Sequence, residues 1–417
     1  EGTISGSSVA NTVGSGSLTI PMMKRLGYRP EFAAAVEAAA STGGQIMPPI
    51  MGAAAFLMAE FTGIPYIEVA KAAILPAVLY FTGIFIAVHY EAKRLGLRGI
   101  PRDQLPGVWS VVKSRGHLIL PLVGIIWLLM EGSTPMKAAF YGILLSVGVA
   151  MLHPSTRMSG REILAALEQG ARGALGVVMA TAVAGIVIGV ITLTGLGLKL
   201  ASGVVQLAQG NLLLTMVATM LTSLVLGMGV PTTANYVITS TIAAPALLQL
   251  GVPLLAAHMF VFYFGVVADI TPPVALAAYA GAGIAGSNPM RTGVVASRLA
   301  VGAFIIPYIF VLSPVLLLQD VTLASSLQML VTSLAGMFGV AVAMGGFLRT
   351  TLALWERALL LVAGVMMIDP NVVTDVVGLA LMAAVVASQV WKARRAAADA
   401  GQLSVGSPEV GRGRTLG

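Results

Sequence analysis

The 417-residue sequence contains no cysteine, only four histidines and few charged residues, with Asp, Glu, Lys and Arg making up 10% of the chain. The absence of cysteine excludes a disulfide framework, a thiolate zinc site and a cysteine nucleophile. The histidines are scattered along the chain and leave little for a metal cluster. Hydrophobic residues make up 57% of the sequence, and this composition is typical of a polytopic membrane protein.

The net charge of +7 does not indicate a protein that binds nucleic acid. Such proteins gather basic residues into one patch with aromatic partners. Here the basic residues form short clusters between apolar runs, and we interpret them as signals of membrane topology. The sequence begins at Glu1 inside a Gly/Ser-rich motif, so we expect a fragment whose N-terminal part is missing.

Apolar runs long enough to cross a bilayer occur along the whole chain. A hydrocarbon core of roughly 30 Å needs about 20 residues per helix. The sequence therefore predicts an all-α polytopic membrane protein. The expected spans are 31–60, 66–90, 117–132, 136–152, 174–198, 254–284, 298–318, 327–345, 355–369 and 372–391. Two further apolar stretches, 1–23 and 211–250, are interrupted by polar residues near the middle.

The Lys and Arg clusters predict the orientation, because short cytoplasmic loops retain positive charge during insertion. The loop at 91–115 carries six basic residues and is placed inside. If successive spans cross the membrane in alternate directions from this loop, only Lys71, Lys137 and Lys199 lie outside, and the C-terminus lies in the cytoplasm. This holds only if 1–23 and 211–250 each enter and leave on one side. Both are therefore predicted to be re-entrant hairpins, with turns buried in protein or lining a cavity.

The sequence repeats itself at a single shift of 224 residues. Asn11 falls on Asn235, and the diproline Pro48-Pro49 falls on Pro272-Pro273. The charge pattern places the two copies on opposite sides, so we predict an inverted-topology repeat, the architecture of many secondary transporters. In those folds substrate and coupling ions bind near the midplane, at the repeat interface, beside discontinuous helices.

The repeat gives an expected division of the chain. The first repeat covers 1–152 and contains hairpin 1 and its diproline helix. A cytoplasmic linker helix follows at 153–173, and the second repeat, with hairpin 2 and the other diproline helix, covers 174–320. Residues 321–417 are expected to form extra transmembrane helices and a basic cytoplasmic tail.

Each copy has two predicted breaks, a polar hairpin tip and a diproline. Proline removes an N–H and clashes with the preceding turn, so carbonyls at the break lose their donors. Freed carbonyls and hydroxyls suit a hard cation such as sodium, while the N-termini of half-helices favour an anion such as a carboxylate. Small residues in such a cluster can also serve only close helix packing. The duplication of the cluster favours binding.

Asp269 is the foremost single candidate, because a carboxylate at mid-span is costly and usually serves an ion, a proton or a partner. No Lys or Arg is expected at its depth, which favours ion binding over a structural pair. We prefer sodium, with proton carriage as the rival. Gln45 at the equivalent position suggests pseudo-symmetric sites of unequal charge. For Glu37, a cavity-facing position and a neutral or interfacial one remain open.

Several motifs resemble one transporter family. Residues 2–13 (GTISGSSVANTV), followed by IPMM at 20–23, are similar to the large membrane subunit of tripartite ATP-independent periplasmic (TRAP) transporters, the DctM type. GQIMPP at 44–49 and PTTANY at 231–236 strengthen the resemblance, which covers roughly 1–320. The extra C-terminal spans look like the fused four-plus-twelve-helix permeases associated with TAXI-type binding proteins.

The resemblance implies a permease of the bacterial or archaeal inner membrane that takes up an organic anion, such as a C4-dicarboxylate, together with sodium by an elevator motion. The implied partners are a TAXI-type periplasmic binding protein, a small four-helix membrane subunit or its fused N-terminal equivalent, and the lipid bilayer. No cofactor, other metal or nucleic acid is expected.

The residues and the resemblance together give the expected sites. The resemblance implies that one ion site is formed by Ser7, Ser8, Asn11 and Thr12 and its mirror by Thr232, Thr233, Asn235 and Asp269. Gln45 and Thr271, beside the two diprolines, are expected as further ion ligands. The substrate is expected between the hairpin tips, near Ser7, Asn11, Thr233 and Asn235. Pro48, Pro49, Pro272 and Pro273 are expected to break their helices.

Two other functions are alternatives to this permease. A divalent-anion/sodium symporter of similar hairpin design would work without a binding protein. An intramembrane enzyme such as a lipid-linked transferase would need clustered carboxylates, His or Arg at the cytoplasmic interface. The polar residues here are expected at mid-depth and include no nucleophile–base pair, so no catalytic residues are expected.

Overall fold

The computed structural model describes residues 2–101, 107–319, 323–369 and 371–405. Arg102 and the end of the predicted basic tail, residues 406–417, lie outside the described residues. The described chain is almost entirely helical, and its extended pairing is a single bridge between Phe347 and Thr351. Six of its helices are long and apolar enough to cross a membrane. The predicted all-α polytopic class is confirmed.

The first repeat is a chain of short helices that ends in a long one. Its elements are α1 (Gly2–Ser5), α2 (Ser8–Gly14), α3 (Gly16–Arg25), α4 (Pro30–Gly44), α5 (Gly52–Thr62) and α6 (Tyr66–Leu95). The Ser7 hydroxyl caps α2 by accepting from the Ala10 N–H. Between α4 and α5 the chain is non-helical around Pro48-Pro49, as predicted.

The second repeat has the same order of elements. It consists of α12 (Leu212–Gly227), α13 (Thr232–Ile242), α14 (Ala244–Gln249), α15 (Leu254–Val267), η3 (Ala268–Ile270), α16 (Leu276–Ala285), α17 (Pro289–Leu299), α18 (Gly302–Leu312) and η4 (Pro314–Leu317). The non-helical segment at 271–275 contains Pro272-Pro273. Both predicted diproline breaks are therefore confirmed.

The sequence shift of 224 residues also relates the two sets of helices. It carries the first residue of α2, Ser8, onto the first residue of α13, Thr232. It also carries Met51 onto Ala275, and these two non-glycine residues both have left-handed backbone (φ 60° and 38°) immediately before α5 and α16. Both diproline bonds are cis. The repeat is thus a property of the backbone as well as of the sequence.

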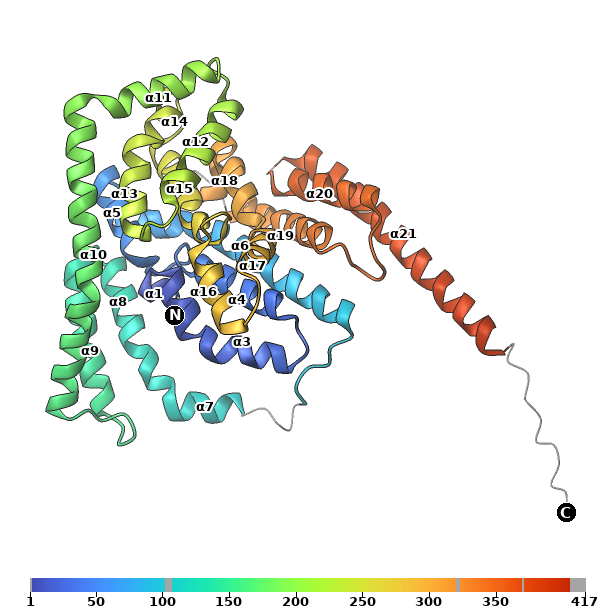
Figure 1. Ribbon diagram of the computed structural model, residues 1–417, viewed down its shortest axis with the longest axis horizontal. Coiled ribbons are helices and arrows are strands. Elements are labelled where there is room, and N and C mark those ends of the chain that lie inside the picture. Colours follow the sequence, from blue (N-terminus) through green and yellow to red (C-terminus); the bar gives the residue numbers. More distant parts are fainter. Residues whose placement is uncertain (1, 102–106, 320–322, 370, 406–417) are drawn as a thin grey trace.

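The segment that joins α6 to α12 contains α7 (Val108–Arg115), η2 (Gly116–Ile119), α8 (Leu120–Met130), α9 (Pro135–Met151), α10 (Gly160–Thr194) and α11 (Leu196–Leu207). The structure differs here from the predicted division into a linker helix at 153–173 and a span at 174–198. Residues 160–194 form one helix, α10, along one edge of the molecule (Figure 1). The Ser159–Glu162 capping box starts it and left-handed Gly195 ends it, with no proline between.

The C-terminal part consists of α19 (Leu323–Gly345), α20 (Leu354–Ile368) and α21 (Val372–Val405). Helix α19 packs against both α6 and α20, while α21 extends away from the body of the molecule (Figure 1). At the start of α20, the fully buried carboxylate of Glu356 joins these elements. It accepts from Ser388 (2.8 Å) and Gln389 (2.9 Å) of α21 and pairs with Lys392 at 2.9 Å.

The hydrophobic core is centred on α15, which is buried along nearly its whole length. Its aromatic side chains pack against α18, with Tyr263 beside Phe310 and Phe260 beside Tyr308. Helices α12 and α13 pack on the same helix. The second diproline break therefore follows directly on the most buried helix of the core, and packing of that helix positions Asp269.

Candidate functional site at the two helix breaks

The two breaks meet the starts of the two hairpin helices in one buried cluster. Ser8, the first residue of α2, donates a hydrogen bond from its hydroxyl to Asp269 Oδ2 at 2.5 Å. Both side chains are buried, although they lie 261 positions apart in the sequence. The polar tip of hairpin 1 therefore contacts the second diproline break, so Ser8 and Asp269 lie in one cluster rather than in the two separate mirror sites expected from the resemblance.

The reciprocal contact joins hairpin 2 to the first break. Gln45 is fully buried. Its amide is assigned the orientation in which both the nitrogen and the oxygen have hydrogen-bond partners. The nitrogen then donates to the Thr232 hydroxyl and to the Gly6 carbonyl, the latter at 3.1 Å. Its amide oxygen accepts from the Ser8 N–H at 3.1 Å. Asp269 also lies within hydrogen-bonding reach of Gln45. Four of the predicted ion ligands, Ser8, Gln45, Thr232 and Asp269, therefore form one network.

These two contacts are related by the repeat. The shift of 224 residues carries Ser8 onto Thr232 and Gln45 onto Asp269. Each hairpin helix therefore places its first residue against the break of the other copy. Asp269 is a carboxylate, whereas its counterpart Gln45 is a neutral amide. The two halves of the network are therefore similar in position but differ in charge.

The two repeated asparagines flank this network without joining it. Asn11 accepts from the Ser5 hydroxyl at 2.8 Å, while Asn235 donates from Nδ2 to the Gly265 carbonyl at 2.7 Å. Each amide is buried and keeps one atom, Asn11 Nδ2 and Asn235 Oδ1, without a hydrogen-bond partner in the described chain. A buried amide oxygen without a donor is a suitable cation ligand.

The remaining predicted residues are placed less centrally. Ser7 uses its hydroxyl to cap α2, and Thr271 donates to the Val267 carbonyl one turn back at 2.7 Å. Neither joins the network through these bonds. Thr12 is fully buried, and its hydroxyl has no partner among the described residues. Thr233 is buried beside Thr232 at the start of α13.

Thr3 was not singled out from the sequence. Its hydroxyl donates to the Met47 carbonyl at 2.6 Å and accepts from the N–H of Ile50 and Met51, so it satisfies freed backbone at the first break. Glu37, for which the sequence left two positions open, is buried in the protein. It accepts from the hydroxyls of Ser15 and Thr19, each at 2.5 Å, and their spacing of four residues was a signal that could have predicted this.

The network offers oxygen ligands in a protein interior. Asp269 supplies the negative charge, and in the described chain no Lys or Arg forms an ion pair with it. The Ser8 hydroxyl contacts this carboxylate, and the Thr232 hydroxyl and the Gln45 amide oxygen belong to the same network, a set of oxygen atoms that suits a hard monovalent or divalent cation. Among the residues that the structure describes, no group of three or more His, Cys, Asp or Glu side chains is placed to hold a metal ion.

Comparison with known proteins places this arrangement in a family. The family model described as "Tripartite ATP-independent periplasmic transporter, DctM component" matches residues 2–325. The chain is 24% identical over 294 residues to the isethionate TRAP transporter permease protein DctMQ of Oleidesulfovibrio alaskensis, covering 68% of this chain and 45% of that protein. It is 28% identical over 156 residues to the uncharacterized protein y4mL of Sinorhizobium fredii, covering 36% of each chain.

The chain spans less than half the length of each of these relatives. The family match nevertheless includes both hairpin tips, both diproline breaks and all four residues of the buried network. The motifs at 2–13, 44–49 and 231–236, from which the same family was predicted, lie inside it. The chain therefore belongs to the DctM family, a membrane component of tripartite ATP-independent periplasmic transporters.

Proposed function

We propose that this chain is the permease core of a sodium-coupled transporter for an organic anion, and that the ion binds beside the Ser8–Asp269 and Thr232–Gln45 contacts. The observation that carries the proposal is the reciprocal contact between each hairpin and the other repeat's break. A cation held there would touch both repeats at once. Its binding would therefore stabilise one relative position of the two hairpins.

The charge of the network supports a cation rather than a second anion. A buried carboxylate without a basic partner is costly in a membrane protein unless an ion or a proton neutralises it. Hydroxyl and amide oxygens complete a shell for sodium. The unpartnered Asn235 Oδ1 and Thr12 hydroxyl are further oxygen ligands within the same pair of hairpins.

The substrate is assigned by electrostatics and by relatedness. A bound cation and the N-terminal end of α13, an 11-residue helix, both favour a negatively charged group between the hairpin tips. One relative is named for isethionate, an organic anion. We therefore assign an organic anion to this chain and propose that it is delivered by a periplasmic binding protein of the TAXI type.

The cellular setting follows the same proposal. The permease would lie in the cytoplasmic membrane of a bacterium or archaeon with its C-terminus in the cytoplasm, as the distribution of Lys and Arg predicts. A four-helix membrane subunit, separate or fused, would complete it. The two hairpins with their diproline helices would move as an elevator past α6, α17 and α18.

Uptake by proteoliposomes that contain the full-length permease tests this function. Substrate would be supplied with and without the binding protein, and with an inward sodium or potassium gradient. The proposal predicts uptake only when both the binding protein and the sodium gradient are present. Uptake with sodium alone would point to a binding-protein-independent symporter, and uptake that ignores sodium would overturn the ion assignment.

A further inference from the structure

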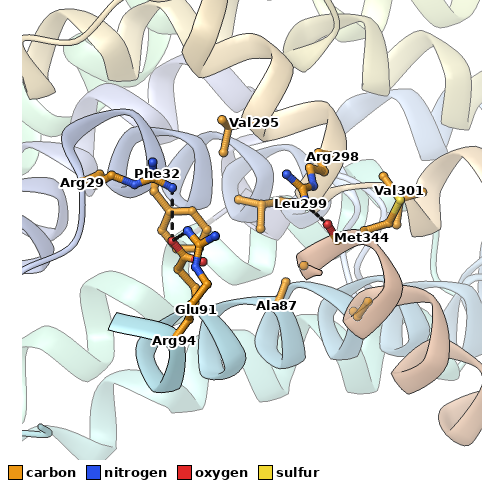
Figure 2. A pocket seen from close by; sticks show the side chains of 13 residues that line it. Arg29, Phe32, Ala87, Glu91, Arg94, Val295, Arg298, Leu299, Val301 and Met344 are labelled. Atoms are coloured by element: carbon orange, nitrogen blue, oxygen red, sulfur yellow. Dashed lines mark hydrogen bonds and ion pairs between the residues drawn. The ribbon is translucent and has the colours of Figure 1, made fainter. Parts of the chain in front are cut away.

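A small cavity of about 90 Å³ lies away from the two breaks, where α4, α6, α17 and α19 meet (Figure 2). Its volume is well below the roughly 300 Å³ of ordinary small-molecule sites. It still exceeds the space of about 30 Å³ that one water occupies in the liquid. The cavity therefore has room for a compact group such as a tetrahedral oxyanion.

Positive charge dominates the lining. Arg29, Arg94 and Arg298 line the cavity together with a single carboxylate, Glu91. Figure 2 shows Arg29 and Arg94 directed at Glu91, which they contact at 3.4 and 2.6 Å, with Arg298 on the opposite side. One carboxylate is thus shared by two arginines.

Arg298 has no carboxylate partner among the described ion pairs. It donates instead to the Met344 carbonyl at the end of α19. Arg357 also reaches this helix end, donating to the Ala343 carbonyl at 2.8 Å, and it lies within electrostatic range of Arg298. The cavity is therefore surrounded by more positive charge than its own side chains neutralise.

We propose that this cavity binds a phosphate-type oxyanion, held by Arg94 and Arg298 with Arg29 at the rim. The planar guanidinium fork matches tetrahedral oxyanions through paired hydrogen bonds. Basic pockets between transmembrane helices bind phospholipid head groups. The site is separate from the proposed sodium site, because none of its lining residues belongs to the buried network.

A neighbouring cavity favours a lipid as the source of the phosphate. It has a volume of about 320 Å³ and shares Arg29, Phe32 and Val295 with the first. Met290 and Val294 add apolar surface that an acyl chain can cover, while Glu31 and Arg291 complete the lining. Inorganic phosphate has the same phosphate chemistry as the head group, but it has no apolar chain that could contact this second cavity.

A bound phosphate would join parts of the molecule that the sequence keeps far apart. Arg29 precedes α4, Arg94 lies in the last turn of α6, and Arg298 lies in the last turn of α17. At its other end α4 leads directly to Gln45. A phosphate bound in the cavity would therefore hold α4, the helix that precedes Pro48-Pro49, against α6 and α17.

Lipid titration of the purified full-length permease tests the proposal. Short-chain phosphatidylglycerol, short-chain phosphatidylcholine and inorganic phosphate would each be titrated by isothermal calorimetry. Arg94→Gln and Arg298→Gln should each weaken phosphatidylglycerol binding roughly tenfold, the effect of losing one charge-assisted hydrogen bond. Arg172→Gln, which removes an equal charge from an exposed pair on α10, should bind like the wild type.

Glu91→Gln separates binding from folding, because it removes the competing carboxylate. Phosphatidylglycerol should then bind more tightly, by about tenfold, whereas damage to the fold would weaken it. Saturation by phosphatidylglycerol alone identifies a lipid site, and competition by inorganic phosphate identifies a site open to soluble anions as well. Equal affinities in wild type, Arg94→Gln and Arg298→Gln, or weaker binding in Glu91→Gln, would overturn the proposal.

Discussion

The Ser8 hydroxyl donates to the Asp269 carboxylate at 2.5 Å, while Thr232, the counterpart of Ser8, contacts Gln45, the counterpart of Asp269. Each repeat therefore completes the polar break of the other. A change at one break alters the surroundings of the opposite hairpin. This exchange explains how an ion bound at one position can influence both halves of the molecule.

Ser8→Ala should weaken sodium binding. The substitution removes one hydroxyl ligand and leaves the buried carboxylate with one fewer donor, so we expect the half-saturating sodium concentration for uptake to rise about tenfold. Ser17→Ala is the matched control, because Ser17 is exposed and only bonds the Gly14 carbonyl within hairpin 1. An unchanged sodium dependence in Ser8→Ala would remove Ser8 from the ion site.

Asn235→Ala should also raise the sodium requirement, because Asn235 Oδ1 is buried without a donor. The loss of the 2.7 Å bond to the Gly265 carbonyl is expected to cost stability as well, by about 1 kcal/mol. Thermal unfolding measured with and without sodium distinguishes the two effects. Sodium should stabilise the wild type more than the variant; equal stabilisation of both would make Asn235 a purely structural residue.

Gly44→Ala should destabilise the first repeat. A Cβ on Gly44 would lie 2.5 Å from the Gly2 Cα, and backbone cannot move away as a flexible side chain can. Overpacking of this kind costs about 1–3 kcal/mol, so the unfolding midpoint should fall. Gly185→Ala on α10 is the control, because a Cβ there meets no atom within 4 Å. A midpoint that falls equally in both variants would contradict the close contact.

Glu356→Gln should loosen the C-terminal helices. The change removes the charge that pairs with Lys392 and disturbs a buried acceptor of several hydrogen bonds, at a cost of about 1–3 kcal/mol. Limited proteolysis should cleave the α20–α21 segment faster than in the wild type. Glu168→Gln, in an exposed pair with Arg172, should leave the rate unchanged. Unchanged protection in Glu356→Gln would show that this carboxylate does not hold α21.

The repeat and its breaks could be predicted from the sequence because Asn, Gly and Pro have specific structural roles at particular positions. Pro48-Pro49 and Pro272-Pro273 end helices for a steric reason, and the structure places breaks at both. Ser8, Gln45, Thr232 and Asp269 were all predicted as ligands. Their pairing across the repeats could not be predicted, because a single sequence does not state which polar groups meet in space.

The linker region shows where local composition misleads. Charges at Arg161, Glu162, Glu168 and Arg172 suggested a surface helix separate from the apolar stretch that follows. A change from polar to apolar residues does not by itself end a helix, and no proline occurs before Gly195. The glycines within the segment keep a right-handed backbone, whereas Gly195 is left-handed. One 35-residue helix results. Arg29, Arg94 and Arg298, which line the small cavity with Glu91, are likewise interpreted from the sequence only as signals of membrane topology.

The most direct test of the central claim is the sodium dependence of uptake by Asp269→Asn. The variant keeps the size of the side chain and removes its charge, and insertion into the membrane is checked by its yield in purified membranes. Asn288→Asp, which adds a carboxylate at the exposed start of α17, tests whether any change of charge alters uptake. The account predicts that Asp269→Asn abolishes uptake or makes it independent of sodium, while Asn288→Asp behaves like the wild type. Uptake by Asp269→Asn with wild-type sodium dependence would contradict it.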